Sequence, residues 1–93
     1  MNFGVNVKLG RLYRGLTQAE FADALRNEMA GRRWTTPMVA ALEANKKAFT
    51  LPILIAVSKV LDLPYIWFIE GPTAVRANPG YLNPEELETL AAA

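Results

Sequence analysis

Cysteine and histidine are both absent from this 93-residue chain. Their absence excludes disulfide bonds, thiolate nucleophiles, imidazole bases and zinc-finger ligand sets. Ser58 falls on a predicted core stripe, so the chain offers no nucleophile, base or metal cluster from which a catalytic centre could be assembled. The sequence therefore predicts a protein that is not an enzyme, with no cofactor, no metal and no evident small-molecule ligand.

Long apolar runs are also missing. No stretch approaches the roughly 20 apolar residues of a membrane helix, because Ser58-Lys59 and Asp62 interrupt the longest apolar region. Met1-Asn2-Phe3 does not begin a secretory signal, since no basic start is followed by an apolar run. We therefore expect a cytoplasmic protein with no membrane partner. Its hydrophobic content of 52% suffices for one core in a single small domain.

The charges are divided unevenly along the chain, although the net charge is only +1. Residues 1–59 hold nine basic and four acidic side chains, whereas residues 60–93 hold one basic and five acidic ones. A phosphate-facing half and a solvent- or partner-facing half would give this asymmetry. Ordinary mixing of surface charges is the alternative reading.

Two short helices are predicted in the middle of the basic half. Thr17 and Glu20 have the spacing of a capping box, so a helix should begin at Gln18 and can extend through Met29. Thr35 or Thr36 can cap a second helix, which has a proline in its first turn. Asn45 should end this helix, because asparagine tolerates the left-handed conformation that often follows a helix.

Further helices are predicted on both sides of this pair. Residues 3–14 form the first helix, ended by a glycine, and two apolar rows, Val5-Leu9-Leu12-Leu16 and Phe3-Val7, compete for the core. Residues 51–61, capped by Thr50, follow the helical period, and residues 65–69 make a short fifth helix. From Gly71 the proline and glycine content predicts a linker or irregular arm, followed by a short helix over residues 84–92.

Three segments carry a family resemblance: Arg11, residues 15–22 (GLTQAEFA) and residues 39–47 (VAALEANKK). They resemble the lambda-repressor and Cro-like (XRE-type) helix-turn-helix family of phages and prophages, over roughly residues 3–71. The resemblance implies an all-α fold: a compact five-helix lambda-repressor-like helix-turn-helix domain at 1–71, then a linker or arm with a short extra C-terminal helix at 72–93. The connection from Arg26 to Trp34 is longer than the family's usual turn.

The resemblance also implies which residues meet DNA. The second motif helix would enter the major groove with its N-terminus, where first-turn side chains meet base edges. Of its base-reading positions only Thr36 can form hydrogen bonds through its side chain, so we expect modest base readout, helped by apolar contact with thymine methyls. The predicted DNA-binding residues are Gln18, Arg32, Arg33, Thr35, Thr36, Pro37, Met38, Ala40, Ala41, Asn45, Lys46 and Lys47.

Phosphate contacts are predicted at both ends of the second motif helix. Gln18 matches the family residue that bonds the DNA backbone, and the basic pairs at residues 32–33 and 46–47 flank the helix. The alternative for the four basic residues is that they are solvated loop charges that do not contact DNA. Arg11 and Glu43 match a family pair that forms an internal salt bridge. Trp34 is either a core side chain or a base-stacking one.

The last predicted helix of the domain carries more apolar surface than so short an element can bury. Its aromatic residues either complete the core or cover a dimer interface. The residues assigned to a possible dimer interface are Trp67, Phe68, Tyr81, Leu87 and Leu90.

The sequence therefore predicts a sequence-specific DNA-binding transcriptional regulator, most like a phage repressor. It would bind double-stranded operator DNA as a homodimer in the bacterial cytoplasm, associated with the nucleoid. Dimerisation would set two reading helices about 34 Å apart, one turn of DNA. The alternative is an antitoxin or another protein-interaction module on the same fold, whose acidic, apolar C-terminal part masks a partner.

Overall fold

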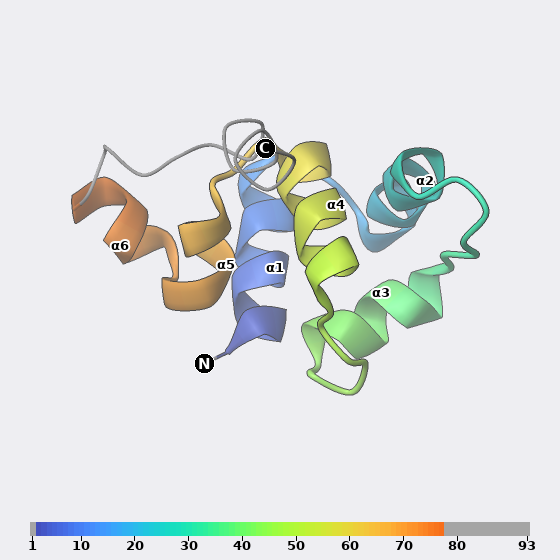
Figure 1. The fold of residues 1–93 in the computed structure, drawn as a ribbon, viewed down its shortest axis with the longest axis horizontal. Coiled ribbons are helices and arrows are strands. Elements are labelled where there is room, and N and C mark those ends of the chain that lie inside the picture. Colours follow the sequence, from blue (N-terminus) through green and yellow to red (C-terminus); the bar gives the residue numbers. More distant parts are fainter. Residues whose placement is uncertain (1, 78–93) are drawn as a thin grey trace.

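The computed structural model describes residues 2–77, which form helices and no strand. The helices are α1 (Phe3–Tyr13), α2 (Gln18–Glu28), α3 (Thr36–Glu43), α4 (Leu51–Leu61), α5 (Tyr65–Glu70) and α6 (Pro72–Ala77) (Figure 1). The predicted all-α class is confirmed for this part of the chain.

Threonine caps begin three of these helices. Thr17, Thr35 and Thr50 each accept, through the hydroxyl, a hydrogen bond from the backbone N–H three residues further on. At Thr17 the capping box is complete, because the Glu20 carboxylate also accepts from the Thr17 backbone N–H at 2.9 Å. Of the two caps considered for α3, the structure uses Thr35.

Left-handed residues end three helices. Gly15 follows α1 with φ 72°, Asn45 follows α3 with φ 59°, and Asp62 caps α4 with φ 51°. Such positive φ values are easiest for glycine and next easiest for asparagine and aspartate. The predicted stops at Gly15 and Asn45 are therefore confirmed.

One hydrophobic core joins α1 to α5. Neither of the two competing rows of α1 supplies its whole buried face: Val7 is buried, but the row through Val5, Leu9 and Leu12 lies on the surface. Trp34 is fully buried, so of its two predicted roles the structure shows the core side chain and not the base-stacking one. The core consists of Val7, Phe21, Ala22, Leu25, Trp34, Val39, Leu42, Ile53, Ala56, Val57, Leu61, Leu63, Trp67 and Phe68.

Small and polar residues let α5 approach α1 closely. A Cβ on Gly10 would lie 3.0 to 3.1 Å from side-chain atoms of Leu61, Leu63 and Trp67. The Trp67 indole Nε1 donates to the Asn6 carbonyl at 3.0 Å, and Asn6 Nδ2 donates to the Phe68 carbonyl at 2.9 Å. Glycine in α1 thus lowers helix propensity but makes room for α5.

Two expectations for the C-terminal part need correction. Trp67 and Phe68 are buried within one chain, so they complete the core and are not available to a dimer interface. The irregular arm predicted from Gly71 is wrong for residues 72–77, which form α6. Pro72 suits the first position of a helix, where its missing N–H costs nothing. Tyr81, Leu87, Leu90 and the predicted helix 84–92 lie outside the described residues.

Candidate nucleic-acid interface

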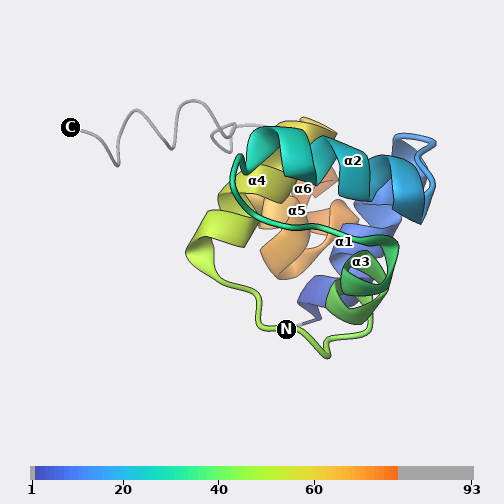
Figure 2. The ribbon, with the colours of Figure 1, turned by 90° about the vertical axis from the view of Figure 1, so that its right-hand side faces the viewer.

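Helix α3 lies at an edge of the molecule, where it packs on α1 and α2 (Figures 1 and 2). Val39 and Leu42 turn into the core, and Glu43 is also buried. Thr36 and Pro37 are exposed on the other side, with Ala40 and Ala41 half-buried. The outward face of α3 is therefore narrow and made of small side chains.

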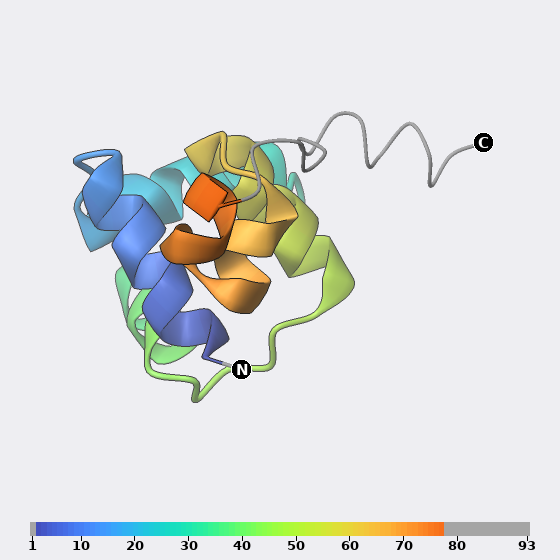
Figure 3. The same ribbon diagram turned by 90° about the vertical axis from the view of Figure 1, so that its left-hand side faces the viewer.

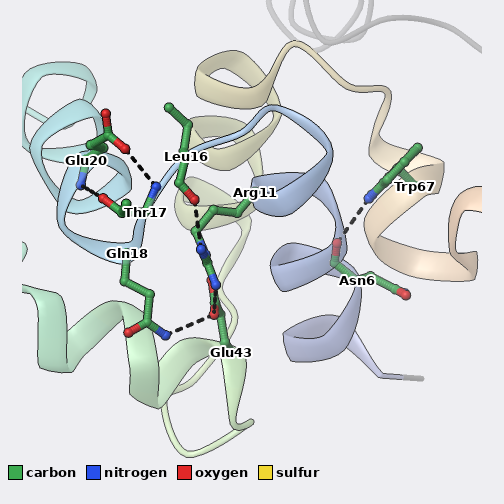
Figure 4. A network of polar contacts seen from close by, with 8 residues as sticks. All are labelled: Asn6, Arg11, Leu16, Thr17, Gln18, Glu20, Glu43 and Trp67. Atoms are coloured by element: carbon green, nitrogen blue, oxygen red, sulfur yellow. Dashed lines mark hydrogen bonds and ion pairs between the residues drawn. The ribbon is translucent and has the colours of Figure 1, made fainter.

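An ion pair inside the protein holds the C-terminal end of α3. Arg11 Nε lies 2.6 Å from Glu43 Oε2 and Arg11 Nη2 lies 3.1 Å from Glu43 Oε1, which gives the bidentate geometry (Figure 4). Arg11 Nη1 also donates to the Leu16 carbonyl at 2.8 Å. Only 6% of Arg11 and 7% of Glu43 is exposed. The salt bridge expected for this pair is present, and it removes the Glu43 charge from the surface.

Gln18 and Asn45, both predicted to contact DNA, form hydrogen bonds within the protein. Gln18 Nε2 donates to Glu43 Oε1 at 3.1 Å, so the first residue of α2 is tied to the last residue of α3. Asn45 Oδ1 accepts from the Gly4 backbone N–H at 2.8 Å, and its Nδ2 donates to Asn2 Oδ1 at 2.8 Å. Asn45 therefore joins the end of α3 to the start of α1, a role that only long-range contacts reveal.

Basic side chains lie at both ends of α3. Arg32 and Arg33 precede it and are exposed, and Lys46 follows it and is exposed. Lys47 is half-buried, with its Nζ 5.4 Å from the centre of the Trp34 ring. From residue 29 to residue 61 the only acidic residue is Glu43. Residues 29–61 therefore carry no exposed carboxylate, and four basic side chains flank α3 within that stretch.

The connection between α2 and α3 is braced from α2. Arg26 donates to the Trp34 carbonyl through Nη1 and pairs with Asp23 through Nη2. Trp34 fills the core below this brace, so the long loop has two fixed points before α3 begins. Sequence reasoning did not identify Arg26, because its partner is a backbone carbonyl.

Not every predicted residue of α3 faces outwards. The Thr35 hydroxyl caps the helix, and Met38 is half-buried against the core, so both are turned towards the protein. Thr36, Pro37, Ala40 and Ala41 remain on the outward side. Ala44, one turn beyond Ala40 and Ala41, is exposed as well and extends this face; the helical period alone would have found it.

The capping box at the start of α2 predicts a pH-dependent stability. Hydrogen bonds from the Thr17 backbone N–H and then from its hydroxyl hold the pKa of Glu20 below its ordinary value. The charged carboxylate therefore stabilises the fold above the unfolded-state pKa, and this contribution disappears as the pH falls through the folded-state pKa. We expect Glu20→Gln to lose less stability than the parent protein between about pH 7 and about pH 3 in urea unfolding. Equal losses would contradict this role.

The comparisons with known proteins add nothing to this geometry: no family model, no curated protein and no solved structure matches the chain. Within residues 2–77, no helix is both long and apolar enough to cross a membrane. The same residues contain no cluster of acidic side chains that could hold a metal ion.

Proposed function

We propose that this chain is a sequence-specific DNA-binding transcriptional regulator of the lambda-repressor and Cro-like kind. The observation that carries the proposal is the surface of α3, a narrow face with exposed basic residues at both ends. Helices α2 and α3 act as the helix-turn-helix, and α3 is the reading helix that enters the major groove of operator DNA.

The size of the outward side chains supports this mode of binding. Threonine, proline and alanine on α3 let the helix backbone come close to base edges, and their methyl and methylene groups suit thymine methyls. Arg32, Arg33, Lys46 and Lys47 then lie where phosphates flank the groove, with Gln18 at the start of α2. Phosphates would supply most of the affinity, and bases a smaller share.

The proposal includes a homodimer on a near-palindromic operator. Two copies related by a two-fold axis would present their reading helices about 34 Å apart, in successive major grooves on one side of the DNA. The protein would then act in the cytoplasm of a bacterial host, on the nucleoid, by occluding a promoter.

A binding titration tests the proposal directly. The purified protein is titrated on its own upstream DNA and on a scrambled duplex at several salt concentrations, and its mass is measured in parallel. We expect tight binding by a dimer to the upstream DNA only, with a log–log salt slope of about −0.9 for each phosphate neutralised. Equally weak binding to upstream DNA and to sequences selected from random DNA would reject the proposal.

The phosphate contacts predict a smaller salt dependence in two single variants. Arg32→Ala and Lys46→Ala should each weaken binding to every sequence and reduce the salt slope by about 0.9, since one phosphate contact is lost. Lys59→Ala is the matched control, because Lys59 pairs with Glu28 at 3.4 Å in the last turn of α4, away from α3 (Figure 1). An unchanged slope in Arg32→Ala and in Lys46→Ala would remove both residues from the phosphate contacts.

A further inference from the structure

Helix α4 is apolar on two sides. The side that includes Val57 and Leu61 is buried in the core. A second row consists of Leu51, Leu54 and Ile55, which lie on one side of the helix because the last two follow Leu51 by three and four residues. Leu51 is exposed, and the other two are half-buried. A helix that is apolar all round is ordinarily buried all round, so this second row needs cover that residues 2–77 supply only in part.

Leu51 is the most prominent residue of this row. It is 65% exposed, the largest fraction among the large apolar side chains of residues 2–77. It is the first residue of α4, directly after the Thr50 cap, so the start of the helix fixes its place. The first turn of α4, drawn in yellow-green, lies at the edge of the molecule in views from two opposite sides (Figures 2 and 3). This leucine is therefore accessible to a partner.

An apolar hollow of about 240 Å³ opens beside Leu51. No charged residue of the described part of the chain lines it. Its volume is below the roughly 300–1,000 Å³ of pockets that hold drug-sized ligands, so it suits an apolar side chain better than such a ligand. The hollow is lined by Phe3 and Phe49, whose ring centres lie 4.7 Å apart, and by Thr50, Leu51, Leu54 and Ile69.

Leu51 also lines a second hollow, of about 410 Å³, between residues 28–32 and residues 51–56. We call the surface formed by the two hollows the α4 face. Thirteen residues line it, about half of the roughly 20–30 that a stable interface uses on each side. Glu28 and Arg32 are its charged members, and the polar rim of an interface stays accessible to solvent. Arg32 at the rim can therefore still meet a phosphate.

The α4 face is complementary to a second copy of itself. In an interface with two-fold symmetry the same patch is used by both subunits. Leu51 projects beside an uncharged hollow, so each leucine can enter the hollow of the other copy without bringing like charges together. The exposed Val5, Leu9 and Leu12 suit a second copy less well. They share α1 with the exposed Lys8 and with no acidic residue, so two such surfaces would repel each other.

We infer that the α4 face is the contact between two copies of this chain, in which Leu51 of each copy packs in the 240 Å³ hollow of the other. The contact takes the place of Trp67 and Phe68, which are buried within one chain. This inference rests on the homodimer of the proposed function, and it does not depend on DNA binding.

Sedimentation equilibrium of the full chain without DNA tests the inference. We expect a reversible monomer–dimer equilibrium between about 1 μM and about 1 mM protein. Leu51→Ser should raise the Kd of the dimer on the order of 100-fold, because both copies lose an apolar side chain from the contact. Leu12→Ser is the matched control, since Leu12 is 54% exposed on α1, outside the α4 face. It should leave the Kd unchanged.

Methyl NMR of the unmodified chain locates the contact without any variant. As the protein concentration rises, the signals of Leu54, Ile55 and Ile69 should shift, whereas those of Leu9 and Leu12 should stay in place. Circular dichroism checks the fold of Leu51→Ser. The first helical position has no intrahelical N–H bond to lose, so the spectrum of this variant should match that of the parent protein.

The outcomes separate the contact from the proposed DNA binding. A monomer at every concentration would overturn the inference, even if it bound its upstream DNA tightly. A dimer whose Kd is unchanged in Leu51→Ser, or raised only in Leu12→Ser, would place the contact on another face and overturn it as well. A dimer that depends on Leu51 but does not distinguish upstream from scrambled DNA would uphold the inference and count against sequence-specific DNA binding.

Discussion

Glu43→Ala should lower the free energy of unfolding by about 3–5 kcal/mol, which is the usual loss when one partner of a buried ion pair is removed. The variant leaves the Arg11 guanidinium buried with only the Leu16 carbonyl as a partner. It also removes the acceptor of Gln18 Nε2. Urea unfolding followed by circular dichroism measures the loss.

Two further variants identify the cause. Gln18→Ala keeps the ion pair and loses one hydrogen bond to a charged group, so its loss should be about 1.5–3 kcal/mol at most. Replacing both partners by apolar residues (Arg11→Met with Glu43→Leu) should restore most of the stability lost in Glu43→Ala, since no charge is left unpaired. A loss below about 1 kcal/mol for Glu43→Ala would mean that solvent screens the pair.

Gly4→Ala should destabilise the fold by roughly 1–3 kcal/mol, the usual cost of overpacking, although alanine favours helix by about 1 kcal/mol. The added Cβ would lie 2.3 Å from the carbonyl oxygen of Glu43 and 2.8 Å from Asn45 Oδ1. The first of these is a backbone atom, so α1 and the end of α3 must separate. Chemical denaturation measures the loss, and the DNA titration should show weaker binding because α3 shifts.

Gly10→Ala is the control for this prediction. Its Cβ would also be crowded, at 3.0 to 3.1 Å, but by the ends of the side chains of Leu61, Leu63 and Trp67. The two leucine ends move more easily than backbone, and the Trp67 ring has only to shift along its hydrogen bond to Asn6, so the loss should be smaller than for Gly4→Ala. The reverse order would show that α1 and α3 are not held rigidly at their contact.

The predicted starts of α2 and α4 and the predicted end of α3 agree with the structure, because caps act locally. Thr17 with Glu20, Thr50 and the left-handed Asn45 each work within a few residues of the chain. The orientation of α1 could not be predicted from an apolar row. On the buried side of α1, Gly4 and Gly10 let other segments approach closely, and Asn6 forms hydrogen bonds with α5. These contacts join residues that are distant in the sequence.

The candidate site could be predicted to a similar degree. The basic residues around α3 and the Arg11–Glu43 pair followed from the sequence resemblance, and the structure places them around one helix. The hydrogen bonds of Asn45 to the start of α1 and the half-buried position of Met38 could not follow, because they depend on how α3 rests on α1 and the core. Helix α6 was missed since proline and glycine were taken as signs of irregular chain.

The buried Glu43 has a consequence for the motions of α3. An eight-residue helix ordinarily frays at its last turn, and local opening of that turn costs little. Here the last residue carries the carboxylate that neutralises Arg11, so fraying would strand a charge in the interior. Native-state hydrogen exchange in the last turn of α3 should therefore follow global unfolding. The helix keeps its shape before any ligand arrives, and little ordering entropy remains to be lost on binding.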